Sequence, residues 1–195
     1  MTLQTQIEKE VKYLISESDY AKFVSLHSIN PIVQINYYFD TKDFWCYQNN
    51  ITVRIRQKND SYALTSKQKT KVSLPYQHSI ENNINLSQSM FEHYVSKGIE
   101  PNQLGLHIGS HLYYIGKLVT YRSKINLWQG VVLDIDKNQY NGIVDYEIEL
   151  EFEDYSQIDI LEQFLAAQEI HVRKAKYSKF KRFVRNVVDK YQLND

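Results

Sequence analysis

The first residues that could do chemistry together are Glu8, Glu10 and Lys12, which occur at every second position near the start of the chain. In a β-strand, side chains at i, i+2 and i+4 lie on one face, so two carboxylates and an ammonium group would share a surface. Carboxylate oxygens are the hard ligands that Mg²⁺ and Mn²⁺ prefer, and these ions also bind phosphate oxygens. Residues 7–13 therefore suggest a strand that could hold a divalent cation next to a phosphate.

The same spacing of charge recurs along the chain, with acids and bases on different segments. The acidic pairs are Glu8 and Glu10, Asp134 and Asp136, and Glu147 and Glu149, and the basic pairs are Arg54 and Arg56, Lys67 and Lys69, and Arg122 and Lys124. In a closed antiparallel barrel the charged residues would line the interior, and the apolar residues between them would face outward under helices. So many Arg and Lys side chains would neutralise a polyanion such as a triphosphate.

The elements that must position these residues are strands interrupted by a few helices. Alternation predicts strands over residues 7–13, 32–40, 51–58, 62–71, 117–125, 130–136 and 145–153. Apolar residues at helical spacing predict helices over residues 17–28, 87–97, 156–168 and 175–191. Residues 101–116, with Pro101 and three glycines, fit neither pattern. Since no linker or repeat divides the chain, we expect one domain over residues 1–195.

The composition is that of an ordinary soluble protein. Hydrophobic residues make up 43% and charged residues 24%, and 23 basic residues balance 23 acidic ones, so net charge favours no particular partner. The one cysteine, Cys46, cannot form an internal disulfide and fits a reducing compartment. The N-terminus has no apolar run suited to a signal peptide or membrane span. We expect a cytoplasmic protein without membrane association.

Two other interpretations of these patterns compete with a charged barrel. A sheet packed on helices on one face and solvated on the other would also alternate charged with apolar residues. Against it, charge fills consecutive inward positions, and acids and bases are sorted by strand. The basic segment 173–190 could suggest nucleic-acid binding. It also carries Phe180, Phe183, Val184 and Val187 at helical spacing, which favours an amphipathic helix packed on the rest of the protein. We therefore expect no nucleic-acid partner.

The segment Glu8-Lys9-Glu10-Val11-Lys12 resembles the ExExK signature of the CYTH superfamily, the triphosphate tunnel metalloenzymes. ExExK alone is a weak pattern, and an ordered set of later motifs makes the resemblance specific. These are Arg54-Ile55-Arg56, Lys67-Gln68-Lys69, Arg122, Asp136, Glu147-Ile148-Glu149 and Tyr177-Ser178-Lys179-Phe180. The resemblance spans nearly the whole chain. The sequence is most similar to small bacterial CYTH proteins of the YjbK type.

The resemblance implies an α+β fold in which a closed eight-stranded antiparallel β-barrel forms a tunnel, with helices packed outside. It implies hydrolysis of inorganic triphosphate, or of a small organic or nucleoside triphosphate, with Mg²⁺ or Mn²⁺ as cofactor. The implied metal ligands are Glu8, Glu10, Asp136, Glu147 and Glu149, with Asp134 as a second choice for Asp136. The implied substrate-binding residues are Lys12, Arg54, Arg56, Lys67, Lys69, Arg122, Lys124 and Lys179. The implied catalytic residues are Glu8, Glu10, Lys12, Glu147 and Glu149, and Glu151 would lie at the tunnel mouth.

Two other functions stay open. An adenylate cyclase making cyclic AMP on the same fold would need polar contacts for adenine and ribose, which the sequence does not identify. A non-catalytic module that binds triphosphate or polyphosphate would be expected if a metal ligand were missing. Because the ligand set implied by the resemblance is complete, the sequence favours an enzyme. It gives no indication of the oligomeric state.

Overall fold

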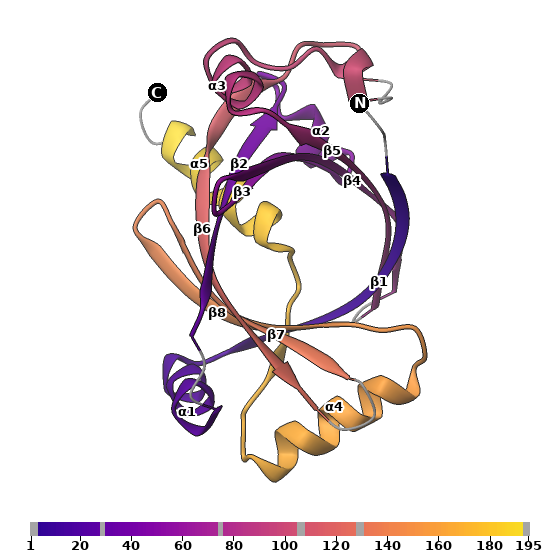
Figure 1. The fold of residues 1–195 in the computed structure, drawn as a ribbon, viewed down its shortest axis with the longest axis vertical. Helices are drawn as coiled ribbons and strands as arrows, with labels where there is room; N and C mark the ends of the chain where they lie inside the picture. The colour runs from indigo at the N-terminus through magenta and orange to yellow at the C-terminus, as the bar shows by residue number, and fades with distance from the viewer. Residues whose placement is uncertain (1–3, 28–29, 74–75, 105–107, 128–130, 193–195) are drawn as a thin grey trace.

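The computed structural model describes residues 4–27, 30–73, 76–104, 108–127 and 131–192, and its centre is a closed antiparallel barrel (Figure 1). The barrel strands are β1 (Gln4–Ile15), β2 (Ile32–Asp40), β3 (Ile51–Lys58), β4 (Ser61–Ser73), β5 (Tyr76–Leu86), β6 (Tyr113–Asn126), β7 (Val132–Tyr140) and β8 (Ile143–Glu151). They pair in the order β5-β4-β3-β2-β6-β7-β8-β1, and β1 pairs back to β5 to close the ring. A two-residue strand, β9 (Arg173–Lys174), also pairs with β1. The expected eight-stranded barrel is confirmed.

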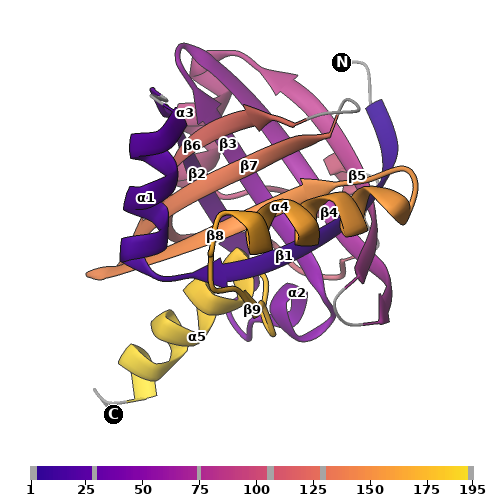
Figure 2. The same cartoon turned by 90° about the horizontal axis from the view of Figure 1, so that it is seen from below.

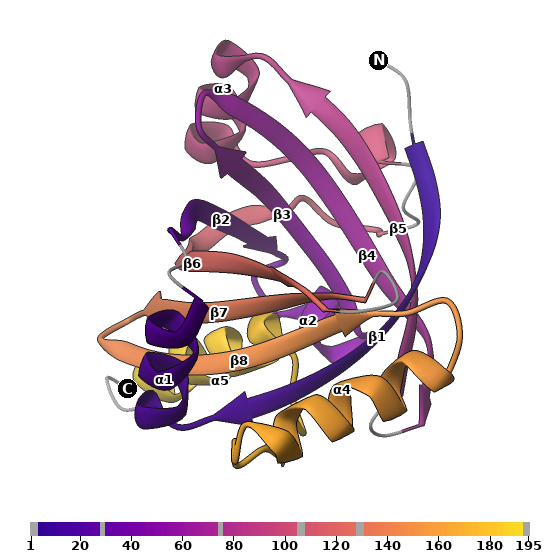
Figure 3. The same cartoon turned by 60° about the horizontal axis from the view of Figure 1, so that its bottom comes forward.

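Helices cover two opposite sides of the barrel. They are α1 (Glu17–His27), α2 (Trp45–Gln48), α3 (Gln88–Lys97), α4 (Ser156–Ala167) and α5 (Lys179–Gln192), with a 3-10 helix over Pro101–Leu104. Figure 2 shows α4 lying along β1 and β8, and Figure 3 shows α3 on the opposite side from α4. None of the helices in the described part of the chain has the length and apolar character needed to cross a lipid bilayer.

The hydrophobic core lies outside the barrel wall, under these helices. Val11, Ile135 and Ile148 point outward and pack with α4 residues such as Leu161, and all four side chains are fully buried. Each buried aliphatic side chain contributes about 1.5–3 kcal/mol to stability. Because alternate residues of a strand face opposite sides, this burial directs their charged neighbours into the lumen.

One end of the barrel is covered by α5. Its residues Phe180 and Phe183 pack against Tyr38, with ring centroids 5.1 and 5.0 Å apart. Tyr38 belongs to the inward-facing set of β2, since it lines the same cavity as Asn36. Gly116 of β6 permits this close approach: its φ is +132°, and a Cβ there would lie 2.9 Å from Phe183. The start of α5 thereby reaches the lumen.

The predicted elements have counterparts in the structure except around residues 72–116 and near the C-terminus, although β7 ends at Tyr140 and not at residue 136. The strands over 32–40 and 51–58 have the predicted bounds, but β5 was not predicted, and β6 begins at Tyr113 inside the unassigned stretch. The sequence of β5 contains three asparagines, which have low strand propensity, and pairing with β1 and β4 on both sides compensates. The last helix begins at Lys179 and not at residue 175. The short elements α2 and β9 were also not predicted.

Candidate metal and phosphate site

The barrel encloses a polar cavity of about 740 Å³, open solvent at its mouth included. Carboxylates and cations from many strands line it together. The acids are Glu8, Glu10, Glu81, Glu149 and Glu151, and the cations are Lys12, Arg54, Arg56, Lys67, Lys69, Arg122 and Lys179. Neutral polar side chains, among them Gln34, Asn36 and Thr120, complete the lining. The composition suits a polyanion accompanied by metal, because neither the acids nor the bases dominate.

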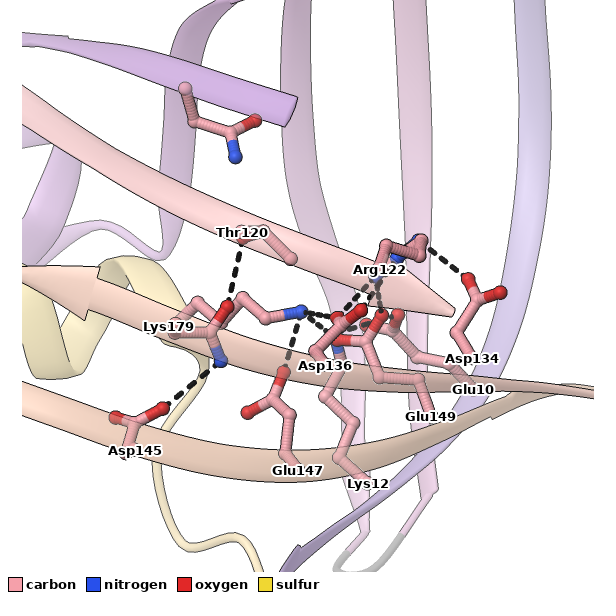
Figure 4. Close-up of polar contacts among 12 residues, drawn as sticks. Glu10, Lys12, Thr120, Arg122, Asp134, Asp136, Asp145, Glu147, Glu149 and Lys179 are labelled. Carbon is pink, nitrogen blue, oxygen red and sulfur yellow. Dashed lines mark hydrogen bonds and ion pairs between the residues drawn. The ribbon is translucent and has the colours of Figure 1, made fainter. Parts of the chain in front are cut away.

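Three buried carboxylates on adjacent strands form a compact set, the three-carboxylate group: Asp136 of β7 and Glu147 and Glu149 of β8 (Figure 4). Asp136 pairs directly with Glu147 across the two strands, and Glu149 lies one inward position further along β8. One oxygen from each lies within 4.8 Å of the others. A set of hard oxygen donors this close together suits a divalent metal ion such as Mg²⁺ or Mn²⁺.

Two basic residues of α5 reach this group from the covered end of the barrel. The Lys179 ammonium lies 2.7 Å from Glu147 Oε1 and 2.9 Å from Glu149 Oε1, and it also contacts Asp136. Arg182, one helical turn later, pairs with Asp145 at 2.8 Å and with Glu147. Burial raises the pKa of Glu147 even though both cations act to lower it. Helix α5 is therefore anchored to the acidic strands by charge.

Lys12 and Arg122 join the three-carboxylate group to other acids of the lumen. The Lys12 ammonium lies 3.0 Å from Glu10 and 2.7 Å from Glu149. Arg122 donates from Nε and Nη2 to the two oxygens of Asp136, at 2.8 and 2.6 Å, and also contacts Glu149 at 2.6 Å. Burial alone would raise the pKa of Glu149, but the surrounding cations, Lys12 foremost, hold it well below its usual value. Glu149 is therefore charged at neutral pH.

Lys12 separates the three-carboxylate group from the two carboxylates of its own strand β1, Glu8 and Glu10. Lys67 of β4 bridges them, 2.6 Å from Glu8 and 3.2 Å from Glu10. Burial acts to raise the pKa of Glu10, and the ammonium groups of Lys12 and Lys67 outweigh it, so that the pKa is lowered to about 2. Among the described residues, the ligand atoms within 4.8 Å of one another come from the three-carboxylate group and not from β1. The term acidic wall denotes Glu8, Glu10, Asp134, Asp136, Glu147 and Glu149.

The facing strands β3 and β4 carry three cations with few counter-charges, Arg54, Arg56 and Lys69, which form the basic wall. Arg54 has one long contact, 3.5 Å to Glu81, and its buried Nε has no hydrogen-bond partner within the described part of the chain. Arg56 donates from Nε to the amide oxygen of Asn36 at 3.0 Å. In the described ranges neither Arg56 nor Lys69 forms an ion pair with a carboxylate.

The pKa values of the basic wall reflect this shortage of counter-charge. Burial, together with the neighbouring Arg54 and Arg122, lowers the pKa of Arg56 to about 10. Burial and nearby lysines lower the pKa of Lys69 to about 8. An anion placed against these side chains would relieve the repulsion among them. The basic wall is therefore the part of the lumen most favourable to phosphate.

Comparison with known proteins decides the family. The family model described as the CYTH domain matches residues 6–184, which is most of the chain. The chain belongs to the CYTH domain family. Among curated proteins, "Putative triphosphatase YjbK" of Bacillus subtilis (strain 168) is 30% identical over 160 residues, covering 78% of this chain and 81% of that protein. The resemblance inferred from the ExExK pattern is confirmed.

Solved structures of similar fold agree with this CYTH assignment. The crystal structure of a "putative adenylate cyclase" from Bacillus halodurans is 28% identical, with a TM-score of 0.76 over 92% of this chain and 98% of that one. HpAC1 from Hippeastrum, described as a "putative adenylyl cyclase" with "dominant" triphosphatase activity, has a TM-score of 0.78 at 22% identity and covers 92% of this chain and 96% of its own. At that identity the likeness shows the fold alone.

The CYTH barrel brings most of the predicted site residues into one lumen. Asp136 and Glu147 do not line the cavity itself: they are fully buried and contact it through Lys179. Lys124 lies at the mouth, where its side chain is 59% exposed and pairs with Asp134 at 2.6 Å. Glu151 also borders this mouth, in a hollow shared with Lys124 and Asp134. Glu81 and Arg182 were not predicted. Glu81 lies on the unpredicted strand β5, whereas Arg182 could have been found from its spacing of three residues after Lys179 on a helix.

Proposed function

We propose that this CYTH protein is a metal-dependent triphosphatase that hydrolyses inorganic triphosphate, or a small organic or nucleoside triphosphate, inside its barrel. The observation that carries the proposal is the division of one lumen into an acidic wall suited to metal and a basic wall whose cations have few counter-charges. A metal site alone would need only the acidic wall, and a simple anion site would need only the basic wall. A triphosphate with its metal ion would use both walls: the carboxylates of the acidic wall would hold the metal, and the cations of the basic wall would bind the phosphate groups.

The residues proposed to hold Mg²⁺ or Mn²⁺ are Asp136, Glu147 and Glu149, with Glu8 and Glu10 contributing from β1. When bound, the metal supplies charge neutralisation and a water of lowered pKa. The proposed catalytic residues are Glu8, Glu10, Lys12, Glu147 and Glu149.

The chain's own cations would do the positioning. Arg54, Arg56 and Lys69 would bind phosphate oxygens from the basic wall, where Arg can grip them in bidentate fashion. Lys12, Lys67, Arg122, Lys124 and Lys179 are further proposed contacts to the substrate. Because the lumen is largely buried, these charges act in a medium of lower dielectric than water, which strengthens stabilisation of the charge on the transferring phosphoryl group.

The relatives support this choice of reaction. The Bacillus subtilis relative carries triphosphatase in its name, at an identity and coverage that establish the family. The Bacillus halodurans relative is described as a cyclase, so cyclic AMP belongs in the same assay. We further propose a single functional domain over residues 1–195 that acts in the cytoplasm on a small substrate and not on nucleic acid. The single cysteine fits such a reducing compartment.

The test measures phosphate release from inorganic triphosphate, ATP, GTP and thiamine triphosphate with Mg²⁺, with Mn²⁺ and with EDTA. Asp136→Asn removes one carboxylate of the three-carboxylate group while keeping its shape, and Asp60→Asn is the matched control on an exposed turn. We expect chelator-sensitive release that falls at least about a hundredfold in Asp136→Asn and is unchanged in Asp60→Asn. Cyclic AMP and pyrophosphate from ATP would indicate a cyclase instead. Tight binding of triphosphate without turnover of any substrate would make the protein a binding module.

A further inference from the structure

The Lys179 ammonium occupies the centre of the three-carboxylate group. It contacts one oxygen of each member: Glu147 at 2.7 Å, Glu149 at 2.9 Å, and Asp136. The Lys179 side chain is only 12% exposed, and those of Asp136 and Glu147 are fully buried. Figure 4 shows the ammonium pointing from α5 toward carboxylates of both β7 and β8. A cation already satisfies the donor set that suits a metal.

We propose that Lys179 is a built-in competitor for the metal: its ammonium holds the three carboxylates in the metal-free protein, and metal binding displaces it into the cavity. This inference rests on the proposed function, since it takes these carboxylates as metal ligands. Carboxylate oxygens bind Mg²⁺ at about 2.0–2.1 Å. A metal at that distance from oxygens that lie within 4.8 Å of one another leaves no room for an ammonium group among them. Like charge also repels it.

The displaced ammonium would enter the main cavity, where it could contact substrate. Lys179 also lines the main cavity, together with its neighbours Ser178 and Phe180. Its flexible four-carbon stem can swing while the backbone stays in place. One metal binding event therefore fills the three-carboxylate group and adds a free positive charge to the lumen, where a phosphate can meet it. The predicted role of Lys179 in substrate binding would then apply to the metal-loaded protein.

The rest of α5 keeps its anchors when Lys179 leaves. Arg182 holds Asp145 at 2.8 and 3.1 Å from two nitrogens, and it also holds Glu147. Phe183 stays packed on Tyr38. The change is thus confined to one side chain at the first residue of the helix, and it needs no opening of the barrel end.

The first experiment measures Mn²⁺ affinity without substrate, by electron paramagnetic resonance and calorimetry. Lys179→Met should bind Mn²⁺ at least tenfold more tightly than the wild type, about 1.4 kcal/mol, because the competitor is gone. Lys181→Met is the matched control on the same helix, since Lys181 donates to Asn50 at 2.6 Å and touches no carboxylate of the group. Its affinity should equal that of the wild type.

Loss of any nearby positive charge would tighten metal binding somewhat, so a second readout follows the displacement itself. Lysine ammonium groups held in ion pairs give ¹⁵N-correlated NMR signals, and the Lys179 signal is assigned by its loss in Lys179→Arg. In the wild-type protein, Mg²⁺ should shift or remove that signal, while the signal of Lys181, which donates to Asn50 at 2.6 Å and contacts no proposed metal ligand, serves as the reference. This readout does not depend on whether Lys179→Met folds.

The outcomes separate this inference from the proposed function. Wild-type Mn²⁺ binding with a static Lys179 signal, or with unchanged affinity in Lys179→Met, overturns the competitor role and leaves the metal-dependent reaction standing. No Mn²⁺ binding by either protein overturns both. Tighter binding in Lys179→Met together with a displaced Lys179 signal establishes the competition.

Discussion

Replacing Arg56 by methionine should make the ligand-free protein more stable and at the same time remove much of its affinity for triphosphate. Arg56 is mostly buried, and the guanidinium groups of Arg54 and Arg122 repel it. In the described residues its hydrogen-bond partner is the amide oxygen of Asn36, at 3.0 Å. Such a side chain costs stability in the absence of an anion. A bound anion would relieve this repulsion, so the free energy that Arg56 costs the ligand-free protein would favour anion binding.

The magnitude follows from the pKa. A fall from the usual 12.5 to about 10 corresponds to about 3 kcal/mol of unfavourable free energy for the charged form. At pH 7 the group is fully charged, so this penalty is present in full. Removing Arg56 also leaves Asn36 without its donor, which costs about 1 kcal/mol. After allowance for solvent screening, Arg56→Met should gain about 1–2 kcal/mol in free energy of unfolding.

The assay is urea unfolding in phosphate-free buffer with EDTA, which prevents metal-dependent turnover. Triphosphate at a hundredfold excess over its Kd should stabilise the wild type by about 2.7 kcal/mol, and Arg56→Met by far less. Lys58→Met is the control, because Lys58 is exposed at the end of the same strand. A variant that is destabilised by more than about 1 kcal/mol, yet gains as much from triphosphate as the wild type, would refute the reasoning about the basic wall.

Three further changes test other parts of the lumen. Glu10→Gln should lower metal-dependent phosphate release at least about a hundredfold with an unchanged circular dichroism spectrum; wild-type turnover would rule out a role for this carboxylate. Because the pKa of Lys69 is lowered to about 8, triphosphate binding near pH 8.5 should take up as much as about one proton in calorimetry across buffers of different ionisation enthalpy, and none in Lys69→Met. Lys69 should also make stability rise between pH 8 and 10.5, where the unfolded chain holds the extra proton. Gly116→Ala, whose new Cβ would meet Phe183 at 2.9 Å, should cost about 1–3 kcal/mol in thermal unfolding, whereas Gly109→Ala, with open space around it, should not.

Sequence-based prediction was most accurate where a strand has one buried and one charged face. In β3 and β8, and in β1 apart from Lys9, the alternation by itself assigns Arg54, Glu149 and Glu10 to the charged face. A slip of one residue would move the apolar set away from the helices. Closure of the barrel could not be predicted from this alternation. Alternation shows two faces of a strand but not which strands pair, and the expectation of closure came from the family resemblance.

The failures have physical causes too. Strand β5 alternates weakly, so Glu81 beside Arg54 could not be predicted; its pairing with two long neighbours holds an asparagine-rich segment in the sheet. The position of α5 at the barrel end likewise could not be predicted from the sequence. Helical spacing identified an amphipathic helix, but the surface that receives it includes Tyr38, an inward-facing residue of β2. Such packing at a barrel end is a tertiary property, which no local period encodes.

If the acidic wall holds metal as proposed, we expect metal and triphosphate to bind with positive coupling. Each member of the acidic wall contacts at least one cation: Glu8, Glu10, Asp134, Asp136, Glu147 and Glu149. A divalent metal binding alone would therefore add positive charge to a wall already neutralised, next to a basic wall with few counter-charges. A triphosphate arriving alone must compete with those carboxylates for Lys12, Lys67 and Arg122. With both bound, the carboxylates would hold the metal, and the cations released from them would bind the anion. Because such coupling is reciprocal, triphosphate must raise the affinity for metal by the same factor as metal raises the affinity for triphosphate.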